Sequence, residues 1–245
     1  MKNKVLSTIF GIAVFFLLIT AAIALPIYLR FFYYMHINAL NLPEQAGVSY
    51  QEIKAAYDEV LNYLTMPWAK FGTGIFPYTE EGASHFADCK KLFTLNSSVL
   101  IVSAAITVTL IILDKNKKIK ILRPAGLSPA FYSAIAALVL PVIIGAFAAT
   151  DFDRAFMLFH KIFFPGKTNW EFSPVGNPII TVLPQEFFRN CAILIGAGLV
   201  IFCLVIIVYQ LKKRKKLTDG GKSEKGRSKD SFTASRKKSS LPFQR

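Results

Sequence analysis

The chain has 245 residues, of which 53% are hydrophobic, and it carries a formal net charge of +14 at pH 7. Its mean hydropathy of +0.42 is too high for an ordinary soluble protein, so the usual guide of roughly 150 residues per domain does not apply. No DNA- or RNA-reading motif accompanies the positive charge, and we therefore expect no nucleic-acid partner.

Four apolar runs each come close to the roughly 20 residues that an α-helix needs to cross a bilayer. They cover residues 5–29, 92–113, 127–149 and 188–209. This pattern predicts an all-α integral membrane protein with four transmembrane helices, in a membrane domain that covers residues 1–210.

The first run could instead be a signal peptide, because Lys2 and Lys4 precede its apolar stretch and Ala22-Ile23-Ala24 is a possible cleavage site. The run is longer than the apolar core of about 7–15 residues that is usual in signal peptides. We therefore expect it to be retained as the first transmembrane helix.

Positive charge is divided unevenly between the segments that connect these helices. Three segments, 1–4, 114–123 and 210–245, together hold 20 Lys or Arg and 4 Asp or Glu. The segments 30–91 and 150–190 together hold 9 Lys or Arg and 11 Asp or Glu. Lys and Arg concentrate on the cytoplasmic side of membrane proteins. Both termini are therefore expected in the cytoplasm of a multi-pass cell-membrane protein, with loops 30–91 and 150–187 forming an extracellular cap.

Each of the two outer loops contains a predicted helix. In the first loop, Ser49-Tyr50-Gln51-Glu52 is a capping box that begins an amphipathic helix of about 16 residues, which either lies on the membrane or covers the bundle. In the second, phenylalanines recur at helical spacing from Phe152 to Phe163, after Thr150 or Asp151 as the N-cap. Pro165-Gly166 ends this helix.

The segment 211–245 is rich in Lys, Arg, Ser and Gly and has almost no residues that could form a core. This composition predicts a disordered cytoplasmic tail that is attracted to anionic lipid of the inner leaflet.

All three histidines lie in the predicted outer loops. His160 shares the apolar stripe of the second-loop helix, where a histidine is often a structural core residue, although ionisable groups at the membrane are also often functional. His85 has Asp88 three residues further on, on the same helical face, as a possible orienting partner. His36 is expected to be a surface or interfacial residue.

The common signatures of serine hydrolases, metalloproteases, phosphate-binding loops and redox dithiols are absent from the sequence. A zinc site built from His85, His160, Cys89 or Asp88 is conceivable, but the spacing matches no known ligand pattern. We therefore expect neither a metal nor a cofactor.

The three cysteines show no motif spacing. Cys203 lies in the middle of the fourth apolar run and is expected to pack as a small apolar residue. Cys89 and Cys191 could pair at the outer surface, although we expect them not to.

Several residue groups together resemble a known family. His85-x-x-Asp88-x-Lys90 precedes the second transmembrane helix, and Phe156-x-x-Phe159-His160-x-x-Phe163-Phe164 follows the third; Trp170, Pro174 and Leu183-Pro184-x-Glu186-Phe187-Phe188 come next. In this order and these places they resemble the lipoprotein intramolecular transacylase family of Gram-positive bacteria, over residues 1–210. Ser84 and Cys89 stand where the family pattern has Glu and Val.

The resemblance implies a substrate and a reaction. The substrate would be a diacylated lipoprotein in the membrane lipid, whose N-terminal Cys bears a thioether-linked diacylglycerol and a free α-amino group. The enzyme would move the sn-2 acyl chain onto that amine and leave an N-acylated, lyso-form lipoprotein. His85 and His160 would be the catalytic residues and would divide the roles of base and of acid or oxyanion donor; which takes which role stays open.

Five more residues are candidates for substrate binding or for supporting the histidines: Asp88, Lys90, Arg154, Trp170 and Arg189. Two other functions stay open from the residues alone. A membrane lipase or acyltransferase could use the same histidines and would release a fatty acid or need a separate acyl donor. A non-enzymatic binding or accessory subunit would use the histidines only for stability.

Overall fold

The computed structural model describes the backbone of residues 1–239 and the side chains of residues 1–216. The described backbone is helical and contains no strand. Its elements are α1 (Lys2–Tyr28), α2 (Arg30–Ala39), α3 (Leu42–Ala46), α4 (Tyr50–Thr65), α5 (Glu80–Lys115), the 3-10 turn η1 (Pro124–Gly126), α6 (Pro129–Thr150), α7 (Phe152–Phe163), α8 (Ile179–Val182) and α9 (Gln185–Ser239).

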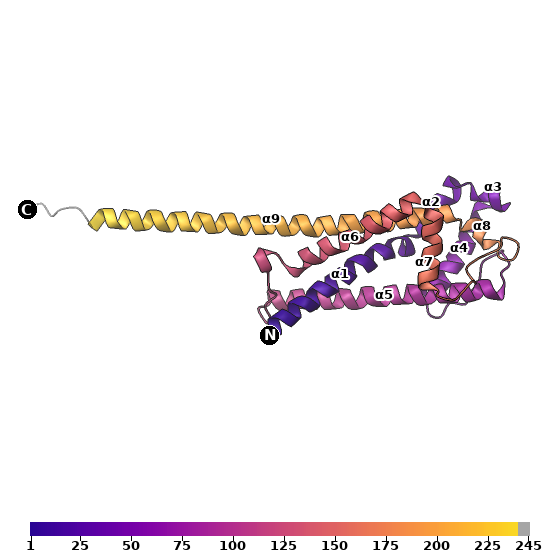
Figure 1. Cartoon of the computed structure of the whole chain (residues 1–245), viewed down its shortest axis with the longest axis horizontal. Helices are drawn as coiled ribbons and strands as arrows, with labels where there is room; N and C mark the ends of the chain where they lie inside the picture. The colour runs from indigo at the N-terminus through magenta and orange to yellow at the C-terminus, as the bar shows by residue number, and fades with distance from the viewer. Residues whose placement is uncertain (240–245) are drawn as a thin grey trace, which may run out of the picture.

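Four of these helices are long and apolar enough to cross a membrane, as the sequence predicted: α1, α5, α6 and the Gln185–Lys216 part of α9. They run side by side as one elongated bundle (Figure 1). Helix α1 packs against α5, α6 and α9. Small residues allow this close packing, since Ala22, Ala134, Ala137 and Cys203 are completely buried in the bundle core.

Two spans are longer than their apolar runs. Helix α5 begins at Glu80 rather than near residue 92, so His85 and Asp88 stand on a rigid extension of a spanning helix and not in a loop. Helix α9 continues past residue 209, to Ser239, into the segment 211–245 for which disorder was predicted. The side chains beyond Lys216 and all of residues 240–245 lie outside the described residues, and the predicted lipid attraction of this tail stays a prediction.

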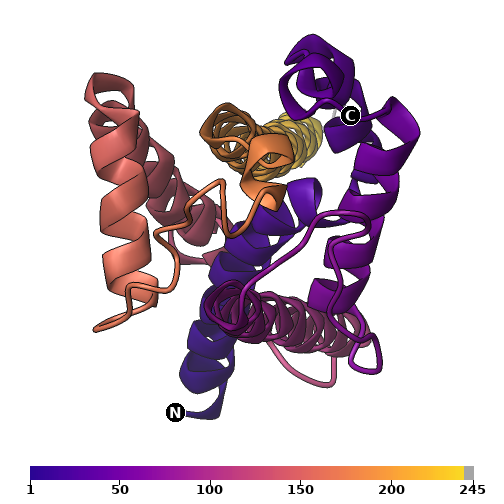
Figure 2. The same ribbon diagram turned by 90° about the vertical axis from the view of Figure 1, so that its right-hand side faces the viewer.

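The shorter helices gather at one end of the bundle, opposite the end that holds the N-terminus (Figures 1 and 2). Helix α4 confirms the predicted amphipathic helix: both bonds of the Ser49–Glu52 capping box form, and the apolar stripe is buried. That stripe packs against α2, where Tyr33 stacks on Tyr57 with ring centroids 3.8 Å apart. Tyr33 also donates a hydrogen bond to the carbonyl oxygen of Val182 in α8, at 2.6 Å.

The first turn of α5 is held by the chain that precedes α8. Thr79 caps the helix by accepting from the Gly82 N–H, and its own N–H donates to Asn177 Oδ1 at 3.0 Å. Asn177 is buried and approaches so closely that a Cβ on Gly82 would lie 2.2 Å from its Oδ1. Glycine at residue 82 therefore lets two distant segments meet one turn before His85.

We predict that Gly82→Ala destabilises the protein by about 1–3 kcal/mol, because the added methyl group must displace Asn177 from the helix start. The loss should appear as a lower unfolding temperature in detergent. Gly145→Ala is the matched control: it lies inside α6 with open space around its Cβ position, where alanine is the better helix former. Equal unfolding temperatures for the two variants would contradict the close packing at Gly82.

Candidate active site

The fold brings together two histidines that lie 75 positions apart in the sequence. His85 comes from α5 and His160 from α7, their ring centroids lie 5.8 Å apart, and each residue is 7% exposed. Helix α7 runs across the bundle at the end where the shorter helices gather (Figure 1). The two histidines that the resemblance singles out therefore lie side by side, and their catalytic role stays a prediction.

Helix α7 begins as predicted and then divides its aromatic residues between two sides. The Asp151 side chain caps the helix by accepting from the Arg154 N–H at 2.9 Å. His160 faces inward with Phe156, at 4.4 Å between ring centroids. Phe159 and Phe163 are about half exposed. The phenylalanines therefore do not form the single stripe that their spacing predicts: Phe156 lies on the inward face of the helix, and Phe159 and Phe163 lie on the outward face.

His160 has a defined protonation pattern. Its Nδ1 lies 2.8 Å from the Phe156 carbonyl oxygen; since a carbonyl only accepts, the proton of the neutral ring is on Nδ1 and the lone pair is on Nε2. Trp170 stacks on the ring at 4.8 Å and 27°. Burial lowers the pKa of His160 below its usual 6.5, and the bond to Phe156 opposes this only in part. The imidazole is therefore neutral at pH 7.

His85 is enclosed by aromatic rings. The ring centroids of Phe164 and Phe172 lie 5.0 and 5.3 Å from the His85 ring centroid, both in edge-to-face arrangements. Its Nε2 lies 3.4 Å from Cys89 Sγ, whereas its Nδ1 is buried without a hydrogen-bond partner. A buried polar atom without a partner costs about 1–3 kcal/mol, so a substrate group that hydrogen-bonds there would recover free energy.

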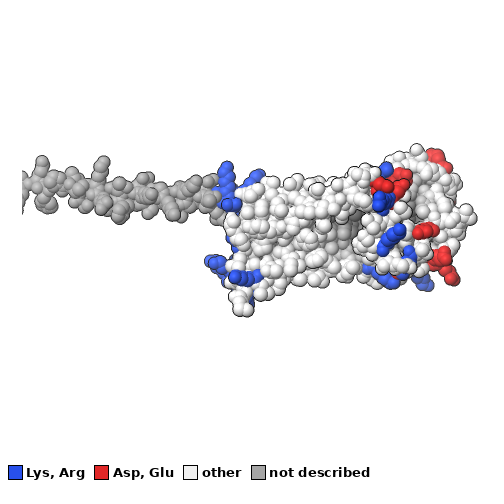
Figure 3. Space-filling model, in the orientation of Figure 1, with Lys and Arg blue, Asp and Glu red and all other residues white. Residues whose placement is uncertain are grey.

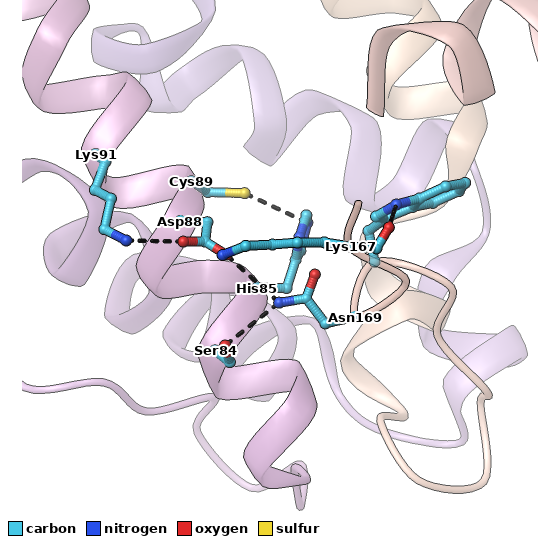
Figure 4. Close-up of polar contacts among 8 residues, drawn as sticks. Ser84, His85, Asp88, Cys89, Lys91, Lys167 and Asn169 are labelled. Atoms are coloured by element: carbon cyan, nitrogen blue, oxygen red, sulfur yellow. Dashed lines mark hydrogen bonds and ion pairs between the residues drawn. The ribbon is translucent and has the colours of Figure 1, made fainter. Parts of the chain in front are cut away.

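Asp88 does not orient His85, contrary to the hypothesis drawn from their spacing. Its carboxylate forms ion pairs with Lys91, one turn along α5 at 2.9 Å, and with Lys167 from the segment after α7 (Figure 4). Asn169 Nδ2 lies within 3.5 Å of the same carboxylate and donates to Ser84 Oγ at 3.3 Å. Lys167 was missed by the sequence analysis, because a single lysine in a loop has no spacing that marks it.

The other candidates lie apart from the histidine pair, with one exception. Trp170 is in contact with His160, as described. Lys90 instead donates to the Met66 carbonyl oxygen at 3.1 Å and lies over the Tyr63 ring, so it anchors the segment after α4. Arg154 and Arg189 are exposed, and within the described part of the chain their side chains form no hydrogen bond or ion pair.

The remaining histidine lies outside the pair, and the three cysteines form no disulfide. His36 lies in α2, where its Nε2 is 3.0 Å from Asn190 Nδ2. Cys89, Cys191 and Cys203 are all free. Among the described residues no group of three or more His, Cys, Asp or Glu side chains is arranged to hold a metal ion.

Comparison with known proteins identifies the family. The model of the family "Lipoprotein intramolecular transacylase Lit" matches residues 8–188. No curated protein sequence matches. A solved structure of the membrane-integral lipoprotein intramolecular transacylase Lit from Bacillus cereus is 26% identical, with a TM-score of 0.76 over 88% of this chain and 98% of that one.

Two further solved structures of the Bacillus cereus protein, carrying the mutations H85R and H85A, are each 25% identical with a TM-score of 0.70. Each match covers 88% of this chain. It covers 94% of the H85R chain and 96% of the H85A chain. The family match extends from the first spanning helix to the start of the fourth and includes both site histidines. The chain therefore belongs to the lipoprotein intramolecular transacylase family and is a membrane-integral acyltransferase.

Proposed function

We propose that this transacylase moves the sn-2 acyl chain of an S-diacylglyceryl-cysteine lipoprotein onto the α-amino group of the same cysteine. The product is the N-acyl S-monoacylglyceryl, or lyso-form, lipoprotein. The observation that carries the proposal is the buried pair of His85 and His160, 5.8 Å apart. An imidazole pair can move the one proton that this reaction has to relocate.

The reaction balances without water, metal or cofactor. The amine nitrogen attacks the sn-2 ester carbon, a C–N bond forms, and a tetrahedral oxyanion results. Its collapse breaks the bond to the glycerol oxygen. One proton leaves the amine and one arrives on the glycerol oxygen, so no net proton is consumed. Because amine and ester belong to one molecule, the protein only has to fold them together.

The hydrogen bonds of the two rings support different roles. In neutral His160, Nε2 is the basic atom, and it forms no hydrogen bond within the described residues; it takes the amine proton. If the Cys89 thiol donates to His85 Nε2, the His85 proton is on Nδ1, the buried atom without a partner. Nδ1–H then donates a hydrogen bond to the oxyanion and keeps its proton. The proton that His160 Nε2 took from the amine passes from the imidazolium to the glycerol oxygen as the C–O bond breaks, so both rings end neutral.

The surroundings protect the ester from hydrolysis. Phe156, Trp170 and Phe164 pack against the His160 ring, and Phe172 packs against His85. Such an aromatic enclosure excludes water, so the tethered amine is the nucleophile that is available. This distinguishes acyl transfer from the lipase activity that the same histidines could otherwise support.

The distribution of charge supports an extracellular active site. Lys and Arg mark the bundle end that holds the N-terminus, and a band without charged residues separates it from the end of mixed charge that carries the histidines (Figure 3). By the positive-inside rule the first end is cytoplasmic. Helix α7, whose Met157, Ile162 and Phe163 side chains are 46%, 62% and 49% exposed, then lies in the outer interface, where the diacylglyceryl group of the substrate is found.

We predict that His85→Ala and His160→Ala each reduce lyso-form product by about a hundredfold or more, the usual contribution of acid–base catalysis. The product would be quantified by mass spectrometry of the lipoprotein N-terminal peptide. His36→Ala, which changes the histidine outside the pair, is the matched control and should retain activity. Near-normal product from either pair variant would contradict the mechanism.

A pH profile tests the role of His160. Activity needs the neutral imidazole, so the rate should fall as pH drops through the His160 pKa, below 6.5. The substrate amine, with a pKa of about 7.7–8.0, adds a separate break at higher pH. Trp170→Ala, which rehydrates the ring, should move the lower break up toward 6.5, whereas Trp68→Phe, at an exposed tryptophan, should not. A lower break that stays in place in Trp170→Ala would contradict this account.

A further inference from the structure

The segment between α7 and α8 carries Trp170, which packs on His160, and it is fastened to α5 by polar side chains. Lys167 forms an ion pair with Asp88, and Asn169 bonds to Ser84 and approaches the same carboxylate. Figure 4 shows Lys167 and Asn169 converging on the α5 turn that holds His85. These hydrogen bonds and this ion pair all join the segment 167–169 to one face of α5.

Asp88 has two lysine partners with different consequences. Lys91 is on the same helix, its side chain is 76% exposed, and its ion pair joins α5 only to itself. Lys167 is 43% exposed and joins α5 to a segment that is distant in sequence. The Asp88 side chain is only 9% exposed, so this carboxylate is a fixed and poorly hydrated anchor. Of the two lysines, Lys167 alone can hold the segment against the helix.

The link continues from Lys167 to the reacting histidine. The Trp170 Nε1–H donates to the Lys167 carbonyl oxygen at 2.9 Å, which fixes the indole relative to the lysine backbone. The indole then stacks on His160, 4.8 Å between ring centroids. The His160 ring is also held by the hydrogen bond from its Nδ1 to the Phe156 carbonyl oxygen. Movement of Lys167 would therefore move the tryptophan that confines the imidazole.

We propose that Lys167 is a positioning residue of the transacylase: its ion pair with Asp88 holds Trp170 on the His160 ring. The inference rests on the proposed role of His160. Lys167 itself touches no reacting atom. Without the charge of Lys167, Asp88 keeps its ion pair with Lys91, but the segment 167–170 loses its strongest bond to α5. The indole of Trp170 then no longer fixes the imidazole of His160 or excludes water from it.

The test compares Lys167→Met with Lys91→Met, which removes the other cation from the same carboxylate. The chain has two tryptophans. Both variants are therefore made in a Trp68→Phe background, in which Trp170 is the one tryptophan that remains. Acrylamide quenching of Trp170 fluorescence reports its packing, and the yield of lyso-form lipopeptide reports catalysis. Lys167→Arg, which keeps a cation able to bond a carboxylate, is the rescue variant.

We expect Lys167→Met to increase the acrylamide quenching of Trp170 and to reduce kcat by roughly tenfold to a hundredfold, because small misplacements of catalytic groups have costs of that order. Lys91→Met should leave both readouts within about twofold of the parent, as is usual for an exposed ion pair. Lys167→Arg should restore most of the activity and the shielding of Trp170.

Equal behaviour of Lys167→Met and Lys91→Met would overturn the inference, as would a loss of activity in Lys167→Met with Trp170 still shielded. Quenching does not depend on turnover, so the two proposals fail separately. An active His160→Ala variant overturns the mechanism, whereas unchanged Trp170 quenching in Lys167→Met overturns the positioning role. If Lys167→Met does not fold, Lys167→Gln replaces it as the uncharged variant in the comparison with Lys91→Met.

Discussion

The structure depends on keeping two neutral imidazoles together at the edge of a membrane. A pair of rings 5.8 Å apart would repel each other if both were protonated, and burial favours the uncharged form of each. The aromatic residues around them supply that burial. This burial leaves one ring nitrogen of His85 without a hydrogen-bond partner, an arrangement that is rare in proteins and that a catalytic role would explain.

Rigid elements on both sides fix this pair. His85 stands on an extension of the spanning helix α5, whose first turn is held by Asn177 at the close approach to Gly82. His160 stands on α7, which is capped by Asp151 and crosses the bundle end. Neither histidine is on a free loop. This arrangement suits a reaction in which the nucleophile and the ester are already tethered and orientation provides most of the rate.

The architecture could be predicted from the sequence because membrane constraints are simple. Span length and hydropathy gave the four helices, the capping box at Ser49 gave α4, and phenylalanine spacing gave α7. The start of α5 at Glu80 was less accessible, since the polar extension lacks the apolar signal that marks a span. The two histidines could be singled out, but their approach depends on the crossing of α7, which no local pattern encodes.

The details of the site were harder to predict than its centre. Asp88, three residues after His85, suggested an orienting carboxylate. Its carboxylate instead pairs with Lys167, which lies 79 positions away in the sequence. Local residue spacing cannot predict an ion pair between such distant residues. Lys90 belongs to the same motif, yet it points to the segment after α4. Trp170 was identified only through family resemblance, because a tryptophan near a membrane is usually an interfacial anchor.

The central claim is that the acyl chain and the amine belong to one lipoprotein molecule. Two model diacylated lipopeptides would be mixed in vesicles with the protein, one with deuterated acyl chains and the other with an isotope-labelled peptide, and the N-terminal products analysed by mass spectrometry. The account predicts unchanged total mass, an acyl chain moved from glycerol to the amine, and no product that combines both labels. Doubly labelled product, or the loss of one acyl mass, would contradict it.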